Sequence, residues 1–404
     1  MANQKTYKWI FPSRFRTGAY GWKSSRLACQ RLREAVSEIK KVVRQDPVLG
    51  GEGAVRLMEK LWPALEYIDS SSGALGAAVG KALDSLIPII VQAPADHKTR
   101  AKWLDRLWVA IENDGVEYLA PVGNHWGELC ASAELASEWA DELLPAVRSC
   151  WAHPSYGNYF HGATACLSCL LVTERYRELL DLLALNSTPF WHHRRYGVDA
   201  LLAMGNKAEA LKYAEASRGL NQPDSLIDRT CEEILISSGL HQEAYQRYGL
   251  SAARGNSYLA RFRSVARRYP MKASAEILSD LIGISPGEEG KWFATAKELK
   301  LFELALQLAN WSPCEPKTLT RAAGDFLDSE PEFALGSALA ALRWLCEGWG
   351  YEVTNFDVTD AYDLALKAGA KLHRDDVSDE ICSLLDQAQG TGSVFVRQVL
   401  SNRL

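Results

Sequence analysis

A ten-residue pattern occurs twice in the middle of the chain, with a spacing of 34 residues. Residues 201–210 read LLAMGNKAEA and residues 235–244 read LISSGLHQEA, and both copies share a central glycine, Gly205 or Gly239, and a final Glu-Ala. A glycine can end a helix in the left-handed conformation that residues with a β-carbon disfavour. A small alanine in the following helix lets two helices approach closely. Each copy therefore predicts a helix, a glycine turn and a second helix.

The rest of the chain has the same helical character. Ser25 to Arg44 carries Leu27, Leu32 and Ile39 at the spacing of one helix face, with lysine and arginine outside. Alternating strand patterns are limited to short pieces such as 351–353, too few to build a sheet. Short helices joined by short turns are typical of αα-hairpins, which stack into a superhelix. We expect an all-α fold, a right-handed αα-hairpin repeat superhelix.

The repeat resembles the tetratricopeptide repeat, which has a period of 34 residues and a G-x-x-x-E-A pattern. Tyr248 falls where that family has its second-helix aromatic residue, whereas Ala214 departs from the pattern and both copies lack the first-helix aromatic residue. Residues 174–183 (ERYRELLDLL) and 299–308 (LKLFELALQL) look like further second helices. The resemblance implies a tetratricopeptide-like solenoid in the C-terminal half.

The N-terminal part is similar to a family of bacterial all-helical proteins of unknown function. The similarity rests on GWKSSRLACQRLREAVSEIKKVV, AKWLDRLWVAIENDGVEYL and HWGELCASAELASEWADELLP, and it covers residues 14–150. It implies a bacterial cytosolic origin and brings no catalytic residues with it. We expect three parts: a basic aromatic arm (1–23), an N-terminal helical domain (24–150) and a helical-repeat domain (151–404).

Positive charge is concentrated at the N-terminus. Residues 1–33 contain eight lysines and arginines and no acid, while residues 34–404 have a net charge of −13. Six aromatic residues are interleaved with these charges: Tyr7, Trp9, Phe11, Phe15, Tyr20 and Trp22. Such an arm suits stacking on nucleic acid, or anchoring to a protein. In a third interpretation the arm packs its aromatic residues against the first helices.

A second basic stretch, residues 254–272, contains six lysines and arginines and no acid, together with Tyr258 and Phe262. It predicts an anion-binding groove or, equally, a solvated helix of the repeat. From the arm and this stretch we select the residues expected to bind a partner: Arg14, Arg16, Trp22, Lys23, Arg261, Arg263, Arg267 and Arg268.

Two clusters of polar residues could bind ligands. Five potential zinc ligands lie in residues 150–169: Cys150, His153, His161, Cys166 and Cys169. Because the last two lie in the apolar run ATACLSCLLV, we favour a bend between helices over a metal site. In FWHHRRYG, residues 190–197, two histidines and two arginines could bind a phosphate. Consecutive helical residues point in different directions, so we favour a solvated helix face with Trp191 packed inward.

No motif for phosphate binding, metalloprotease chemistry or a nucleophile elbow occurs, so we expect no enzyme and no cofactor. The expected function is a non-catalytic protein-protein interaction scaffold of a bacterial cytosol that binds a protein or peptide. The first alternative is a nucleic-acid-associated subunit of a defence or mobile-element complex. The second is a zinc- or cysteine-dependent enzyme. No apolar run approaches the ~18 residues of a membrane span, and no secretion signal is apparent, so we expect a cytoplasmic protein without a membrane partner.

Overall fold

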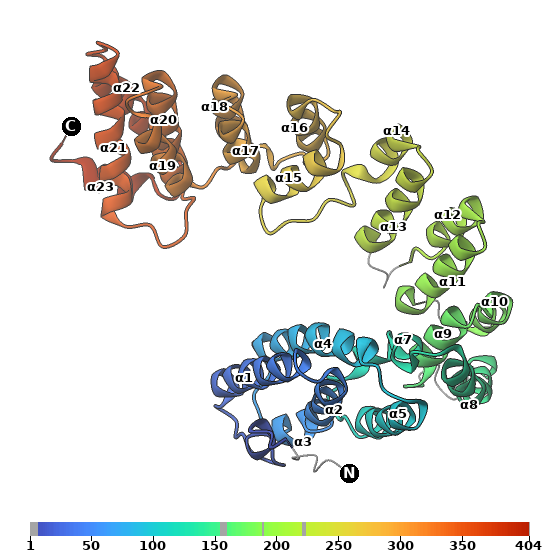
Figure 1. Cartoon of the computed structure of the whole chain (residues 1–404). Helices are drawn as coiled ribbons and strands as arrows, with labels where there is room; N and C mark the ends of the chain where they lie inside the picture. Colours follow the sequence, from blue (N-terminus) through green and yellow to red (C-terminus); the bar gives the residue numbers. More distant parts are fainter. Residues whose placement is uncertain (1–6, 154–159, 188–189, 220–223, 404) are drawn as a thin grey trace. The chain divides into compact units, whose positions relative to one another are not determined.

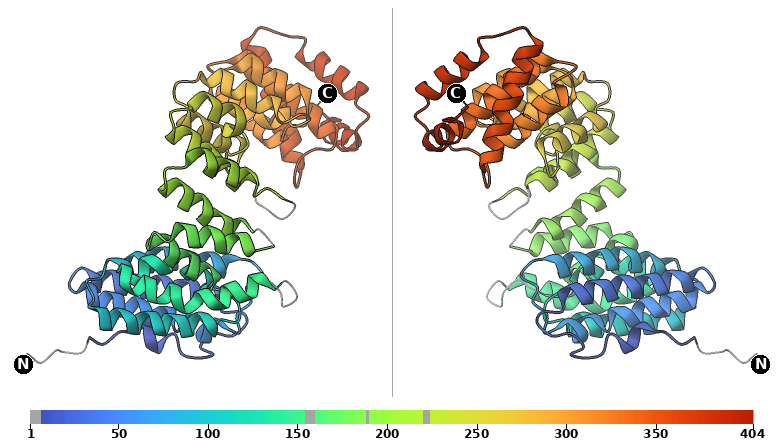
Figure 2. Two further views of the ribbon diagram at one scale, coloured as in Figure 1. Left: turned by 90° about the vertical axis from the view of Figure 1, so that its right-hand side faces the viewer. Right: turned by 90° about the vertical axis from the view of Figure 1, so that its left-hand side faces the viewer.

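The computed structural model describes residues 7–153, 160–187, 190–219 and 224–403. Within these ranges every regular element is helical and no strand occurs, as the sequence predicted (Figure 1, Figure 2). Contacts divide the chain into two compact units, unit 1 (Met1–Ile227) and unit 2 (Asp228–Leu404). The three-part division at residues 23 and 150 was based on sequence character, and it stays a prediction beside this contact-based boundary.

Unit 1 opens with a short 3-10 helix, η1 (Phe11–Ser13). Its α-helices are α1 (Ser25–Val43), α2 (Pro47–Met58), α3 (Leu61–Leu65), α4 (Ala74–Gln92), α5 (His97–Glu112), α6 (Ala120–Gly123), α7 (Trp126–Cys130), α8 (Ala133–Ala152), α9 (Ala163–Val172), α10 (Tyr176–Leu185), α11 (Trp191–Ala203) and α12 (Lys207–Glu215). Helices α1, α2 and α4 pack against one another, and α9 contacts α7, α8, α10 and α11. Leu32 and Ile39 of α1 are buried, in agreement with the predicted inner face, but Leu27, which was predicted there too, is 47% exposed near the start of the helix.

Helix α4 differs from the expectation that no segment could span a membrane. By length and composition alone, its 19 residues are long and apolar enough to cross one. Leu75, Val79 and Leu86 are buried in the core of unit 1, where α4 packs against α1 and α2, while Lys81 and Asp84 are exposed. The core helix of a water-soluble protein meets the same criterion.

Unit 2 contains the second half of the helices. They are α13 (Asp224–Ser237, which begins just before the boundary), α14 (His241–Ala244), the π-helical turn η3 (Tyr245–Gly249), α15 (Tyr258–Arg268), α16 (Ser274–Gly283), the 3-10 helix η4 (Glu289–Trp292), α17 (Phe293–Glu298), α18 (Phe302–Trp311), α19 (Pro316–Phe326), α20 (Pro331–Cys346), α21 (Asn355–Lys371), α22 (Val377–Gln387) and α23 (Ser393–Leu400). Helix α20 packs between α19 and α21 and buries Ala334, Ala338 and Ala341, whose small side chains permit close approach.

Six helices in the described ranges end in the same way. The second residue after each helix has a positive φ, and the backbone N–H of the residue that follows it donates to a carbonyl five residues earlier at 2.8–3.0 Å. The six left-handed residues are Glu174, Gly205, Gly239, Lys300, Gly348 and His373. This hydrogen-bonded turn provides a donor for one of the last carbonyls of the helix and reverses the direction of the chain. The predicted glycine turns at Gly205 and Gly239 are thereby confirmed.

Candidate functional site

Unit 2 carries a groove of about 740 Å³ whose charged lining is entirely arginine. It lies along α15, and α13 and the segment before α15 also contribute to it. The residues that line it are Arg229, Arg254, Ser257, Leu259, Ala260, Arg263, Ser264, Arg267 and Arg268. Five positive side chains around one hollow, with no acid in the lining, attract an anionic ligand. We call this hollow the arginine groove.

The helical period of α15 explains why its arginines share a face. Ser257 caps the helix, since its side-chain oxygen accepts a hydrogen bond from the backbone N–H of Ala260 at 3.1 Å. Phe262 and Val265 turn inward and are buried. Arg263 and Arg267, four residues apart, therefore project together on the outer face.

The arginines of the groove differ in their carboxylate partners. Arg263 pairs with Glu298 at 2.6 Å, and Arg229 pairs with Glu233 at 3.0 Å. Arg267 has neither a hydrogen bond nor an ion pair to any residue that the structure describes. The groove therefore keeps a positive charge that its own residues do not neutralise.

A buried carboxylate fixes the inner end of the groove. Glu232 is 1% exposed, contacts the guanidinium of Arg268 and accepts a hydrogen bond from the hydroxyl of Tyr269 at 2.6 Å. Burial raises the pKa of Glu232, while Tyr269 and Arg268 act to lower it. The buried carboxylate of Glu232 thus holds Arg268 in place, whereas Arg267 is exposed.

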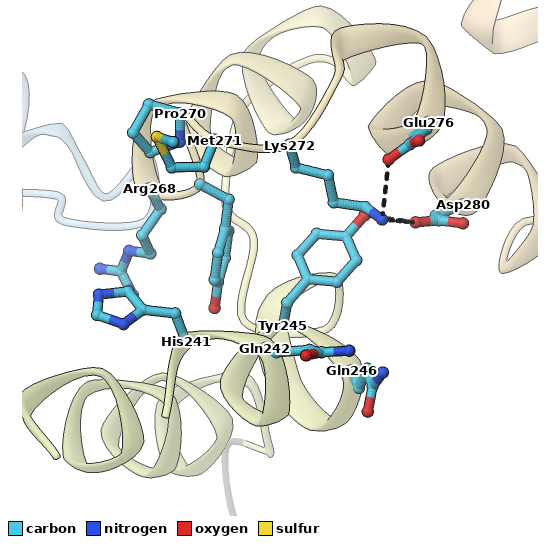
Figure 3. Close-up of a pocket in the computed structure, with 11 residues that line it drawn as sticks. His241, Gln242, Tyr245, Gln246, Arg268, Pro270, Met271, Lys272, Glu276 and Asp280 are labelled. Atoms are coloured by element: carbon cyan, nitrogen blue, oxygen red, sulfur yellow. Dashed lines mark hydrogen bonds and ion pairs between the residues drawn. The ribbon is translucent and has the colours of Figure 1, made fainter. Parts of the chain in front are cut away.

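A second hollow of about 560 Å³ adjoins the arginine groove, and Arg268 lines both (Figure 3). We call it the tyrosine pocket. The rings of Tyr245 and Tyr269 meet edge to face at 4.9 Å, and Met271 at its rim is 98% exposed. An apolar side chain that is left almost wholly in water beside an aromatic pocket is suited to covering by a partner.

Lys272 is held on the opposite side of the tyrosine pocket. Figure 3 shows its amine between the carboxylates of Glu276 and Asp280, at 3.4 and 3.5 Å. The same amine lies 4.5 Å from the centre of the Tyr245 ring, and the Tyr245 hydroxyl donates a hydrogen bond to Asp280 at 2.6 Å. Burial, followed by that hydrogen bond, raises the pKa of Tyr245, so its hydroxyl stays protonated at neutral pH.

The N-terminal arm has its aromatic residues packed inward. Trp9, Phe11, Phe15 and Tyr20 are buried, and a β-carbon at Gly53 of α2 would collide with the Trp9 ring at 2.3 Å. This arrangement agrees with the interpretation in which the arm packs against the first helices. Because these four rings are buried, most of the aromatic residues of the arm cannot stack on nucleic acid bases.

The polar residues predicted in the arm lie outside that packing. Arg14 pairs with Glu34, which also pairs with Arg31 at 2.8 Å. Arg16 and Lys23 are exposed, and Trp22 is 66% exposed. These residues remain predicted contacts, but they belong to unit 1, whereas the arginine groove belongs to unit 2.

Three of the four arginines predicted on the basic helix, Arg263, Arg267 and Arg268, line the arginine groove together. Arg261 does not line it, because its guanidinium lies over the rings of Tyr258 and Trp292, at 5.9 and 5.8 Å. Arg229 was missed by the sequence reasoning. It precedes Arg263 by 34 residues, so the repeat spacing was the signal that could have identified it.

The five potential zinc ligands between residues 150 and 169 do not gather. Cys166 and Cys169 are buried within α9, and burial raises the pKa of the Cys166 thiol to about 12. His153 lies 3.1 Å from the carbonyl of Ser149. Among the described residues, three or more potential ligands approach one another only at His97, Glu134 and Glu138. The predicted bend covers 154–159, which lie outside the described residues.

The FWHHRRYG segment begins α11 and is more buried than predicted. Trp191 packs inward as expected, but His193 and Tyr196 are buried as well. Burial, with smaller contributions from His192 and Arg195, lowers the pKa of His193 to about 3. Arg194 stacks on the ring of Tyr213 at 3.8 Å, so the four basic side chains of the segment do not converge on one ligand.

Comparisons with protein-family models, with curated proteins and with solved structures find no match. The two resemblances drawn from the sequence therefore stay predictions.

Proposed function

We propose that this chain is a non-catalytic scaffold of a bacterial cytosol, a tetratricopeptide-like solenoid that binds an acidic segment of a partner protein. The observation that carries the proposal is the arginine groove, in which five arginines line one hollow and Arg267 has no partner among the described residues. Arginine presents a planar fork that binds carboxylates through two parallel hydrogen bonds. An acidic peptide supplies such carboxylates at regular intervals.

Long-range side-chain contacts support the repeat architecture. In stacked hairpins each residue meets its counterpart one repeat away, so contacts near a separation of 34 residues are expected. Four such contacts lie in unit 2: Glu232 with Arg268 (36 apart), Tyr245 with Asp280 (35), Ala309 with Trp344 (35) and Lys317 with Tyr351 (34). One lies in unit 1, between Asp141 and Arg175 (34 apart).

The tyrosine pocket favours a protein over a nucleic acid as the partner. Nucleic acid strands bind to positive grooves in which aromatic rings stack on successive bases. The lining of the arginine groove contains no aromatic residue, and the rings of Tyr245 and Tyr269 lie edge to face in the neighbouring hollow. A peptide can place carboxylates in the groove and an apolar side chain against Met271. Nucleic acid binding remains the second candidate, because its phosphates suit the same five arginines.

The test is direct binding to the purified full chain at about 150 mM salt, where distant surface charges are screened. The probes are a fluorescein-labelled glutamate-rich peptide that contains a leucine and a single-stranded oligonucleotide of equal net charge. We expect the peptide to bind more tightly, and its affinity to fall when the leucine is replaced by glycine. Stronger binding of the oligonucleotide would favour the second candidate.

Charge reversal locates the binding site. Arg267→Glu should weaken peptide binding by roughly 10- to 100-fold, since a hydrogen bond to a charged group contributes about 1.5–3 kcal/mol. Arg321→Glu is the matched control, because Arg321 is exposed on α19 and does not line the arginine groove. If both variants weakened binding equally, overall charge would explain the affinity and the groove would not be the site.

A further inference from the structure

Three potential metal ligands converge on the surface of unit 1. His97 is the first residue of α5, while Glu134 and Glu138 lie one turn apart near the start of α8. One nitrogen of the imidazole and one oxygen from each carboxylate all lie within 4.8 Å of one another. From this convergence we infer that His97, Glu134 and Glu138 bind a divalent transition-metal ion, with zinc as the best fit.

The backbone that carries these side chains is fixed by caps on both helices. Asp96 caps α5 by accepting a hydrogen bond from the N–H of Thr99 at 2.7 Å, and Ser132 caps α8 through the N–H of Leu135 at 3.2 Å. All three ligand side chains are exposed, so only side-chain rotation separates them from coordination. In a tetrahedral zinc site with bonds near 2.1 Å, neighbouring ligand atoms are about 3.4 Å apart.

The three side chains are available to bind an ion. None of the three side chains forms a hydrogen bond or ion pair with any described residue. Other surface acids of unit 1 differ in this respect: Glu128 pairs with His125 at 3.0 Å and Glu178 with Arg175 at 2.7 Å, whereas Glu142 has no partner among the described residues. Two carboxylates one helical turn apart repel each other. A divalent ion between them would balance their charge.

The ligand set selects the class of metal. Imidazole nitrogen favours zinc and its first-row neighbours over magnesium and calcium, which prefer sites made of oxygen ligands alone. The group contains no thiolate, so the soft, cysteine-rich type of zinc site does not apply. Three protein ligands leave a fourth position for water or for a ligand from a partner. The ion would join the start of α5 to the start of α8.

Calorimetric titration of zinc chloride into the metal-free full chain tests the inference. We expect one equivalent to bind, and His97→Ala and Glu138→Gln each to weaken that binding by at least about 100-fold, because even outer-shell partners of metal ligands contribute 10- to 100-fold. Glu142→Gln, at an exposed acid one turn further along α8, should leave the affinity unchanged. All of these positions are exposed, and circular dichroism checks that the variants fold.

The nine cysteines of the chain make a second probe necessary. Cobalt(II) bound to nitrogen and oxygen lacks the intense thiolate-to-metal absorption that appears when cysteine is a ligand. We expect a cobalt spectrum without that absorption, and we expect the spectrum to disappear in His97→Ala. A thiolate band, zinc binding that survives His97→Ala, or no zinc binding at all would overturn the inference.

Discussion

The N-terminal arm and helix α15 have the same kind of sequence, basic residues mixed with aromatic ones, but they differ in structure. In the arm, Phe11 and Phe15 are buried, and Arg14 is paired with Glu34. In α15, Phe262 is buried too, yet Arg263 and Arg267 line an open groove. Aromatic residues pack inward in both regions. The hollow beside the arm is lined by Arg14 and Arg33 together with Glu34 and Glu38, whereas the charged lining of the groove along α15 is arginine alone.

The difference shows what a composition of basic and aromatic residues can and cannot indicate. A regular helix separates apolar from charged residues onto two faces, and three of the four arginines of α15 line one hollow. The only regular element in the described part of the arm is the short η1, so Arg14, Arg16 and Lys23 share no helix face. A positive stretch is therefore better evidence for a binding surface when it has helical period.

The largest expected effect tests whether the arm belongs to the core. Phe15→Ala should lower the free energy of unfolding of unit 1 by about 3–5 kcal/mol, as for a fully buried phenylalanine. Hydrogen exchange of the amides in α1 and α2 reports unit 1 alone. Trp22→Ala, at a residue that is 66% exposed, should change the free energy of unfolding of unit 1 by no more than about 0.5 kcal/mol. Equal effects of the two variants would mean that the arm is not packed as described.

A third basic and aromatic stretch, at the start of α11, extends the comparison to pH. The pKa of His193 is about 3 in the folded chain, against 6.5 for an unburied histidine. Below pH 6.5 this histidine binds a proton in the unfolded chain but stays neutral in the folded chain. The stability that neutral His193 contributes is therefore complete above pH 6.5 and is lost as the pH falls toward 3. The loss at pH 5 should be about 2 kcal/mol.

Unfolding in urea at pH 7 and pH 5 measures this loss. The loss should shrink in His193→Phe, which keeps an aromatic ring and removes the titrating group. His153→Gln, at an exposed histidine, should preserve it. A His193→Phe protein with the full wild-type loss at pH 5 would show that His193 does not titrate as the burial predicts.

A smaller effect concerns the six shared helix ends, where glycine and non-glycine versions can be compared. Lys300→Gly should raise stability by about 1 kcal/mol, because a residue with a β-carbon is strained at φ 59°. Gly205→Ala should lower it by a similar amount, since no atom lies within 4 Å of the added methyl group and only the backbone is affected. Thermal unfolding measures both changes. As a control, Lys297→Gly inside α17 should be destabilising.

The smallest expected effect on stability belongs to the residue that matters most for the proposed binding. Arg267→Ala should leave the unfolding free energy within about 0.5 kcal/mol of the parent, because an exposed side chain without a partner contributes little. It should nevertheless weaken binding of the acidic peptide. Loss of stability without loss of binding would assign Arg267 a structural role instead.

The sequence pattern was sufficient for the features that depend on neighbours along the chain. It predicted the helix that starts at Ser25, the turns at Gly205 and Gly239, and the basic face of α15. These follow from the helical period and from the conformational freedom of glycine. The left-handed turns at Glu174 and Lys300 were not predicted, because packing of the flanking helices there overrides the preference of the residue itself.

The features that depend on contacts between distant residues could not be predicted in the same way. The contribution of Arg229 to the groove, and the stacking of Arg261 on Trp292 instead, depend on which helix packs beside α15. The convergence of His97 with Glu134 likewise joins residues 37 positions apart. A single sequence does not give the distance between two residues so far apart in the chain, nor the direction in which their side chains point.

The contacts of unit 2 between residues 33 to 37 positions apart have a consequence for its response to force. In the proposed solenoid these contacts join each helix pair of unit 2 to the next pair along the chain, so tension across unit 2 should detach one pair at a time. Each step would release about 34 residues, which extend by roughly 115 Å when stretched out. Unit 1 differs, because Arg106 of α5 contacts Glu52 of α2, 54 positions earlier. Pulled at constant speed, unit 2 should lengthen in a series of similar increments, whereas unit 1 should yield in one larger step.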